Sequence, residues 1–300
     1  MFALSLSWNV NKFRSAKKQI DEIVKVGFKE LELNFSLTEK RIRQIDRLRK
    51  EGMIRILSCH NFCPIPNCLS TKKALPDYYS ISSLNEKKRR LALKYTKKSI
   101  ETASQLKARA LILHSGRVDM QDKSKQLMQL FAAGKGNSSA FKSIKNRMRI
   151  LREKRKKPHL EKALTSIGEL SNYAKKLNVK LGLENRIYYS EIPQLDEFDI
   201  LLQNTNAFFW FDTGHARIMQ KLWGIREKEY LKRYSSKFIG VHLHDVIGMQ
   251  DHLAPGVGEL NFKSLAPYIK RNTIKVIEAH AAASKEELGQ SINFLNKIFS

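Results

Sequence analysis

Eight short runs rich in β-branched and aromatic residues recur along the chain, and helix-like segments separate them. The runs cover residues 2–8, 28–35, 54–60, 109–114, 179–185, 207–212, 238–244 and 274–279. The segments between them include residues 17–26 and 164–177, in which apolar side chains recur every three or four positions. Strands that alternate with helices predict a parallel sheet, because parallel neighbours need a crossover connection.

Eight such units predict an α/β fold in which the sheet closes into a single (β/α)8 or TIM barrel, with residues 1–300 forming one domain. An open, doubly wound sheet is the alternative, but polar residues suited to chemistry follow nearly every run and favour closure. The connection between the fourth and fifth runs, residues 115–178, is long. We expect an extended loop with one or two helices there, and one interpretation is a lid over the barrel mouth.

The formal net charge of +26 is the most unusual property of the composition. Lysine and arginine release counterions from phosphates, so nucleic acid is one candidate partner. Most of the excess is lysine spread along the predicted helices, with one dense cluster at residues 141–159, and a solvated outer face explains that spread equally well. In either case the positive field attracts anionic small molecules, phosphorylated sugars included.

No apolar run approaches the ~20 residues of a membrane span, so we expect no membrane partner. The apolar N-terminal stretch has no basic region before it, and we interpret it as the first strand rather than a signal peptide. Cys59, Cys63 and Cys68 are odd in number and closely spaced. This favours loop thiols in a reduced, cytoplasmic setting over a disulfide framework.

Seven of the eight histidines lie at or just after the end of an apolar run or in a glycine-rich loop, and only His159 lies in an obviously polar stretch. The seven are His60, His114, His215, His242, His244, His252 and His280. Carboxylates occur at the same places, at Glu184, Asp212, Asp245 and Glu278. The strand ends of such a barrel meet at its active face. Imidazoles and carboxylates gathered there predict a Zn²⁺ or Mn²⁺ site.

Several of these residues have structural alternatives. Asp212 precedes Thr-Gly and is suited to cap a helix. Asp245 is a metal ligand, a partner that orients a histidine, or a cap. Arg186 is placed to clamp a phosphate or carboxylate, or to form an exposed ion pair. The glycine-rich stretch 251–262 is expected to hold His252 on a structured loop.

The motifs LENR (183–186), DTGHA (212–216), GVHLHD (240–245), DHLAPGVGELNF (251–262) and IEAH (277–280) resemble, in this order, those of the xylose isomerase-like TIM barrels. That superfamily joins sugar-phosphate isomerases and epimerases with abasic-site nucleases of the endonuclease IV type. The resemblance covers essentially the whole chain and is strongest from 179 to 280. It is specific for the superfamily and does not specify a substrate.

The resemblance to the ketose 3-epimerases implies one divalent ion, Mn²⁺ or Zn²⁺, held by Glu184, Asp212, His242 and Glu278. It implies that Glu184 and Glu278 are also catalytic, one removing and one returning a proton while the ion stabilises the enediolate of a sugar or sugar phosphate. His215 matches a substrate contact. His244 and His280 match no position of the family pattern, and we assign them structural roles.

The resemblance to the nucleases implies up to three zinc ions and hydrolysis of abasic DNA instead. His60, His114, His215 and His252 then join the four residues above as ligands. This chain departs from the nuclease pattern at Gln250, where an aspartate is usual, and Asp251 follows it. The departure weakens the prediction of a third zinc ion. It also weakens the prediction of phosphodiester hydrolysis, because the complete cluster is needed to clamp the phosphate. A sugar isomerase or epimerase is therefore the leading hypothesis, and an apurinic/apyrimidinic endonuclease is the alternative.

Overall fold

The computed structural model describes residues 1–299, and its centre is a closed barrel of eight parallel strands. The strands are β1 (Ala3–Ser5), β2 (Glu30–Leu33), β3 (Arg55–His60), β4 (Ala110–Leu113), β5 (Lys180–Glu184), β6 (Phe208–Asp212), β7 (Phe238–Leu243) and β10 (Ile274–Ile277). Each strand pairs with its predecessor, and β10 closes the ring on β1, with Ala3 opposite Val276. The predicted (β/α)8 barrel is therefore confirmed, and the open sheet is excluded.

All eight strands lie inside the predicted runs. The largest difference is at the first run, where β1 ends at Ser5 and a 3₁₀ helix, η1 (Leu6–Trp8), continues it. A small antiparallel pair, β8 (Asp245–Ile247) and β9 (Gln250–Leu253), stands outside the barrel. His252 lies on β9, where the glycine-rich stretch 251–262 begins.

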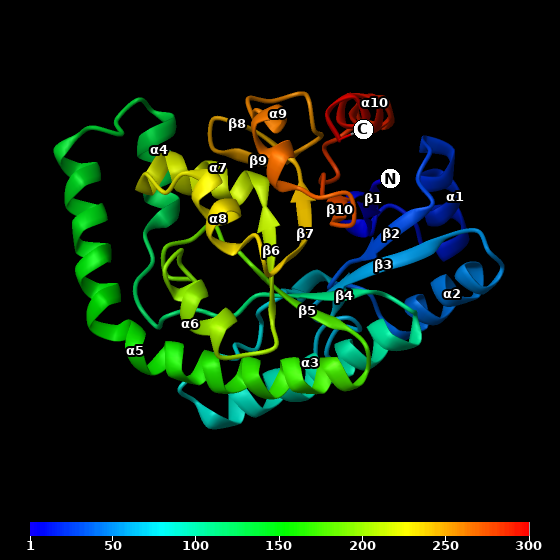
Figure 1. Cartoon of the computed structure of the whole chain (residues 1–300), viewed down its shortest axis with the longest axis horizontal. Helices are drawn as coiled ribbons and strands as arrows, with labels where there is room; N and C mark the ends of the chain where they lie inside the picture. The colour runs from blue at the N-terminus through cyan, green and yellow to red at the C-terminus, as the bar shows by residue number, and fades with distance from the viewer. Residues whose placement is uncertain (300) are drawn as a thin grey trace.

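The helices surround the barrel (Figure 1). They are α1 (Ala16–Val26), α2 (Glu39–Lys50), α3 (Glu86–Gln105), α4 (Ser124–Ala132), α5 (Ser139–Lys176), α6 (Glu197–Gln203), α7 (Thr213–Trp223), α8 (Glu227–Tyr234), α9 (Phe262–Leu265) and α10 (Lys285–Phe299), with short 3₁₀ turns η2 (Thr71–Lys73) and η3 (Ala266–Tyr268). Helix α1 shows why such segments form. The Ser15 side chain caps its start, Ile20 and Ile23 face the core, and Gly27 ends it at φ +113°.

Trp210 of β6 is fully buried in a small apolar cluster formed by barrel strands. Its ring centroid lies 5.2 Å from that of His242 on β7, so the indole packs against one of the predicted site residues. The space for the indole comes from a glycine: a Cβ atom at Gly240 would come within 2.0 Å of the ring. The large Trp210 side chain on β6 and the missing side chain of Gly240 on β7 therefore determine the packing next to the predicted site.

The long connection between β4 and β5 contains two helices, as predicted. Helix α5 has 38 residues, includes Pro158, and bends around the side of the barrel (Figure 1). Its first half contains the basic cluster 141–159, yet His159 within that cluster is buried, with Nδ1 2.9 Å from the Ser82 carbonyl oxygen. His159 is buried although the sequence around it is polar, because that turn of the helix packs against the loop before α3.

None of the described helices combines the length and the apolar character that a membrane crossing requires. Cys59 and Cys63 are buried, Cys68 is exposed, and all three are free thiols. The cytoplasmic location and the single domain over residues 1–300 stay predictions.

Candidate metal centre

A cavity of about 810 Å³ opens at the end of the barrel where the strands terminate. Its lining includes His60, His114, Glu184, Arg186, His215, His252, Glu278 and His280, together with polar residues of the first two strand ends such as Ser7, Asn11 and Asn34. Residues of the loop after β3, Thr71 to Pro76, border it. No described lining residue comes from 115–178, so the long connection does not cover this cavity as the lid interpretation required.

Four of the predicted ligands meet at one point on the cavity floor. Glu184, Asp212, His242 and Glu278 are buried, and one ligand atom from each lies within 4.8 Å of all the others. His242 Nδ1 is 3.0 Å from Glu184 Oε1, 2.9 Å from Glu278 Oε2 and 3.7 Å from Asp212 Oδ2. Ligand atoms about 2.1 Å from a shared divalent ion stand roughly 3–3.5 Å apart, so the tetrad fits such an ion. Three carboxylates and one imidazole suit Mn²⁺ or Zn²⁺.

The other oxygen of Glu184, Oε2, faces two further imidazoles, those of His60 and His114. His114 Nε2 lies 2.9 Å and His60 Nε2 3.7 Å from Glu184 Oε2, and the two rings are nearly perpendicular. Both nitrogens of the buried His114 lack a hydrogen-bond partner of acceptable geometry. An unpartnered buried imidazole is costly, and a metal ion would satisfy it. His60, His114 and Glu184 therefore form a second candidate position for an ion.

Asp212 has both of the roles that its sequence left open. It is the N-cap of α7, since Oδ1 accepts the His215 N–H at 2.7 Å, while Oδ2 faces His242. His244 Nε2 contacts Asp212 Oδ1 at 2.8 Å, and His244 Nδ1 accepts the His252 backbone N–H at 2.9 Å. That N–H requires a lone pair on Nδ1, so Nε2 is protonated and donates to Asp212. The purely structural role expected for His244 is incomplete, because the ring also orients a candidate ligand.

His215 and His252 lie beside the tetrad and form a third group of possible ligands. Asp251, the residue after Gln250, has Oδ1 3.1 Å from His252 Nδ1 and Oδ2 4.0 Å from His215 Nε2. The ring of His252 is stacked between those of His244 and His280, with centroids 4.1 and 3.8 Å away. A metal lies in the plane of an imidazole that binds it, so these parallel rings cannot share an ion without turning. His215, tilted by 69° from His252, can share one with it.

Burial alone would raise the pKa of each carboxyl in the centre, but the neighbouring cations and imidazoles outweigh it. Arg186 and the imidazoles of His114, His242 and His60 hold the pKa of Glu184 well below its usual range. His215 and His244 do the same for the pKa of Asp212, and His242 for that of Glu278. Burial lowers the pKa of His114 to about 3. The centre thus presents ionised carboxylates and a neutral His114, as a metal ion requires. Burial would lower the pKa of His242, but Glu278 and Glu32 raise it, so an ion would have to displace a proton from that ring.

Arg186 pairs with two of the protein's own carboxylates. Its Nη1 donates to Glu184 Oε2 at 3.0 Å and its Nε to Glu191 Oε1 at 3.2 Å. The ion pairs are present but buried, not exposed as the alternative expected, because both carboxylates lie inside the barrel end, and a clamp on a ligand anion stays a prediction. Asp245 is neither ligand nor helix cap: its carboxylate accepts the backbone N–H groups of Gly256 and Leu260 and so shapes the glycine-rich loop.

Glu32 is a buried carboxylate that the sequence reasoning did not single out. It lies on β2, has no exposed surface, and contacts His242 Nε2 at 3.1 and 3.2 Å. The signal was present in the run FKELELNF, where Glu30 and Glu32 alternate with apolar residues. Alternation of that kind also describes a strand with one solvated face, and only barrel closure turns that face inward.

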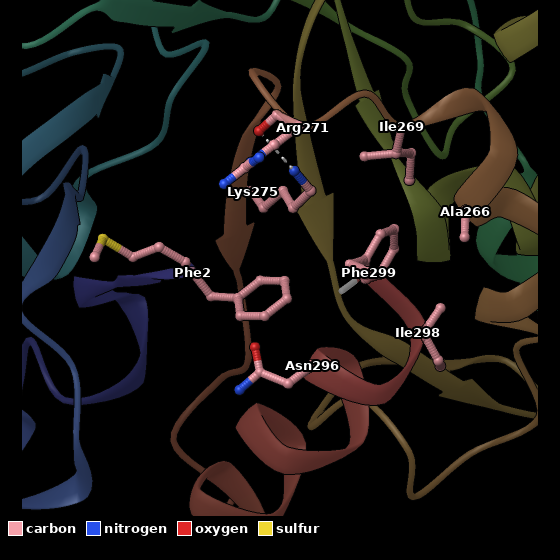
Figure 2. A pocket seen from close by; sticks show the side chains of 9 residues that line it. Phe2, Ala266, Ile269, Arg271, Lys275, Asn296, Ile298 and Phe299 are labelled. Atoms are coloured by element: carbon pink, nitrogen blue, oxygen red, sulfur yellow. Dashed lines mark hydrogen bonds between the residues drawn. The ribbon is translucent and has the colours of Figure 1, made fainter.

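A second cavity, of about 640 Å³, lies around the start of β10 (Figure 2). Phe2, Ile269 and Phe299 give it an apolar lining, and Arg271 and Lys275 are its cationic residues. Lys275 Nζ donates to the carbonyl oxygens of Lys270, Arg271 and Thr273, so its charge is already used to hold the turn before β10. Its described lining contains no carboxylate or imidazole, and it offers no comparable chemistry.

Comparisons with known proteins agree with this architecture. A family model described as xylose isomerase-like TIM barrel matches residues 20–298. A D-tagatose 3-epimerase-like protein has 19% identity and a TM-score of 0.66 over 99% of this chain and 96% of its own. D-psicose 3-epimerase from Clostridium cellulolyticum, solved with D-tagatose, has 14% identity and a TM-score of 0.69 over 100% and 99%. A Thermus thermophilus protein soaked with ZnCl₂ has 19% identity and a TM-score of 0.59 over 99% and 96%. No curated protein sequence matches significantly.

Proposed function

Because the chain belongs to the xylose isomerase-like TIM barrel family, we propose that it is a divalent-metal-dependent sugar isomerase or epimerase. The observation that carries the proposal is the tetrad Glu184, Asp212, His242 and Glu278, whose ligand atoms lie within 4.8 Å of one another beneath the mouth cavity. Glu184 and Glu278 also line that cavity, whereas His242 and Asp212 lie below them. The two glutamates therefore contact both the ion position and the substrate position.

A divalent ion held by Glu184, Asp212, His242 and Glu278 would supply Lewis-acid polarisation of the substrate carbonyl. The residues do the rest. One glutamate, as the carboxylate, removes the proton from the carbon beside the carbonyl, and the other, as the acid, returns a proton to the opposite face. The two glutamates are not equivalent, because Glu184 Oε2 faces Arg186 and His114, and the carboxylate of Glu278 faces His242 at 2.9 Å. Arg186 opposes protonation of Glu184, and His242 opposes that of Glu278, so both pKa values are low and both side chains start as carboxylates.

The neighbours named above support a ketose substrate, since one is a psicose epimerase solved with D-tagatose. Of the basic side chains, the described cavity lining includes Lys72 and Arg186, and Arg186 is already paired. Most of the other basic residues lie on outer helices, and several of them form ion pairs, such as Arg49 with Asp46. This distribution favours a small carbohydrate over a nucleic-acid strand. Lys72 and the overall charge keep a phosphorylated sugar within the proposal.

The test is solvent exchange. The protein loaded with Mn²⁺ is incubated in D₂O with free ketoses and ketose phosphates, and NMR follows both a new epimer or isomer and deuterium beside the carbonyl. The proposal expects both for at least one substrate. Neither product nor deuterium across the panel, from protein shown to hold the ion, overturns it.

Zinc-dependent cleavage of abasic DNA is the second candidate function, and one observation favours it. All eight residues that match the nuclease ligands converge on the cavity. In addition, Asp251 lies beside His215 and His252, so it offers a carboxylate in place of the aspartate that the nuclease pattern has at position 250. Elemental analysis after zinc loading separates the two functions. One ion per chain supports the isomerase, whereas three ions together with cleavage of an abasic-site duplex support the nuclease.

A further inference from the structure

We infer that Glu32, on the opposite side of the barrel from the ligand cluster of β5 and β6, is a positioning residue for the metal centre and acts through His242. The inference rests on the proposed metal-dependent function and adds a residue to it. Glu32 and His242 are both completely buried, and Glu32 is absent from the described lining of the cavity. Glu32 therefore does not touch the substrate position. It also lies on the Nε2 side of the His242 ring, away from the ion position on the Nδ1 side.

The contacts of His242 divide between its two nitrogens. Nδ1 faces Glu184, Asp212 and Glu278, which are the other members of the tetrad. Nε2 lies 3.1 Å and 3.2 Å from the two oxygens of Glu32. Carboxylates only accept and they face both nitrogens, so the free imidazole donates from both; when an ion displaces the proton on Nδ1, Glu32 is the acceptor that keeps the proton on Nε2. Glu32 thus selects the productive tautomer and fixes the plane of the ring.

Glu32 is itself held by its neighbour in the sheet. Ser58 is directly opposite Glu32 in the β2–β3 pairing, and its hydroxyl donates to Glu32 Oε2 at 2.8 Å. The result is a chain of buried contacts from Ser58 through Glu32 and His242 to the ion position. A carboxylate behind a metal-binding histidine also makes the imidazole a stronger ligand, and loss of such a partner costs about 10- to 100-fold in metal affinity.

The matched test uses two substitutions on the same strand. In Glu32→Gln the amide can turn its NH₂ toward Nε2 and place the proton of His242 on Nδ1, against the ion. Glu30→Gln makes the same change two residues earlier, at a buried glutamate that pairs with Arg55 instead. Mn²⁺ and Zn²⁺ dissociation constants are measured by chelator competition, with thermal melting of the metal-free proteins alongside. We expect the Kd to rise about 10- to 100-fold in Glu32→Gln and to stay unchanged in Glu30→Gln.

A second variant keeps the test independent of the folding of the first. Ser58→Ala removes only the donor behind Glu32, and its Kd is expected to rise about threefold to tenfold, below the full loss of the carboxylate. A Kd within twofold of the wild type in both folded variants, or in Ser58→Ala alone if Glu32→Gln does not fold, overturns the inference. A change confined to the melting temperature does the same, since it marks a structural role. If the wild-type protein binds no ion, the proposed function itself fails, which is a distinct result.

Discussion

Buried charged side chains have different kinds of partners at the two ends of the barrel. At the end where the strands begin, Glu30 is paired with Arg55, and Lys275 is bonded to three backbone carbonyls. At the end where they terminate, buried carboxylates converge on one imidazole, and His114 has no hydrogen-bond partner. Charges of the first kind are satisfied by the chain alone. Charges of the second kind are arranged for a group that the chain does not supply, and this distinguishes a functional end from a structural one.

Removing a proton-transfer group at the functional end is expected to have the largest effect. Glu278→Gln keeps the size of the side chain and loses its basicity, so kcat should fall by about 10²- to 10⁴-fold. Steady-state kinetics at saturating Mn²⁺, with the metal content of each protein measured, provides the value. Glu30→Gln, at the other end, is the matched control and should retain wild-type kcat. A Glu278→Gln variant with full activity would contradict the proton-transfer assignment.

Metal removal is expected to lower stability as well as activity. An ion that binds only the folded chain adds about 2.7 kcal/mol to the free energy of unfolding at 100 times its Kd. Chelated protein should therefore melt at a lower temperature, and added Mn²⁺ should restore both the transition and the activity. Scanning calorimetry at several ion concentrations measures the shift. A transition that does not move with ion concentration would show that the tetrad holds no ion.

The acid sensitivity of the metal-free protein should depend on His114. Its pKa is about 3 in the fold and 6.5 ordinarily, so the unfolded chain binds the extra proton between these values and stability falls as the pH falls. From pH 7 to pH 5 this contribution amounts to about 2 kcal/mol. His114→Asn should lose correspondingly less stability over that interval than the wild type. Urea unfolding at both pH values measures the difference, and equal losses would place the neutral imidazole in doubt.

The smallest effect is expected at the structural end. The Glu30–Arg55 pair has an arginine that is two-thirds exposed, so solvent weakens the pair, and Arg55→Gln, whose amide can still donate to the buried Glu30, should cost about 1 kcal/mol. Metal affinity and kcat should not change. Urea unfolding and the metal titration used above test both expectations, and any loss of metal binding would erase the distinction between the two ends.

Most of the barrel could be predicted from the sequence because local patterns encode it. The eight strands fall inside the predicted runs, and α1 follows the apolar stripe of Ile20 and Ile23. The lid interpretation failed because the hydrophobic and basic pattern of residues 115–178 specifies helices but not the side on which they pack. The burial of His159 has the same origin, since its partner Ser82 lies on a different segment of chain.

The candidate residues at the strand ends could be named from motifs, but their division of labour could not. Asp212 was open between cap and ligand, and the structure gives its two oxygens one role each. Asp251 is displaced by one position from the nuclease pattern, yet it lies beside His215 and His252. His252, at φ +56°, has a backbone turn that no pattern of residue types signals.

The sequence alone determined the number of strands, their order along the chain, and the set of imidazoles and carboxylates at their ends, and it favoured closure of the sheet over an open one. These depend on periodicity and on which residue ends each run, and both are local. Only the tertiary structure decided which atoms face one another. Nδ1 of His242 faces the other three residues of the tetrad, Nε2 of the same ring contacts Glu32 from across the barrel, and His244 donates a hydrogen bond to Asp212. Such contacts join residues up to 210 positions apart, and they exist only because closure turns one face of every strand toward a common axis.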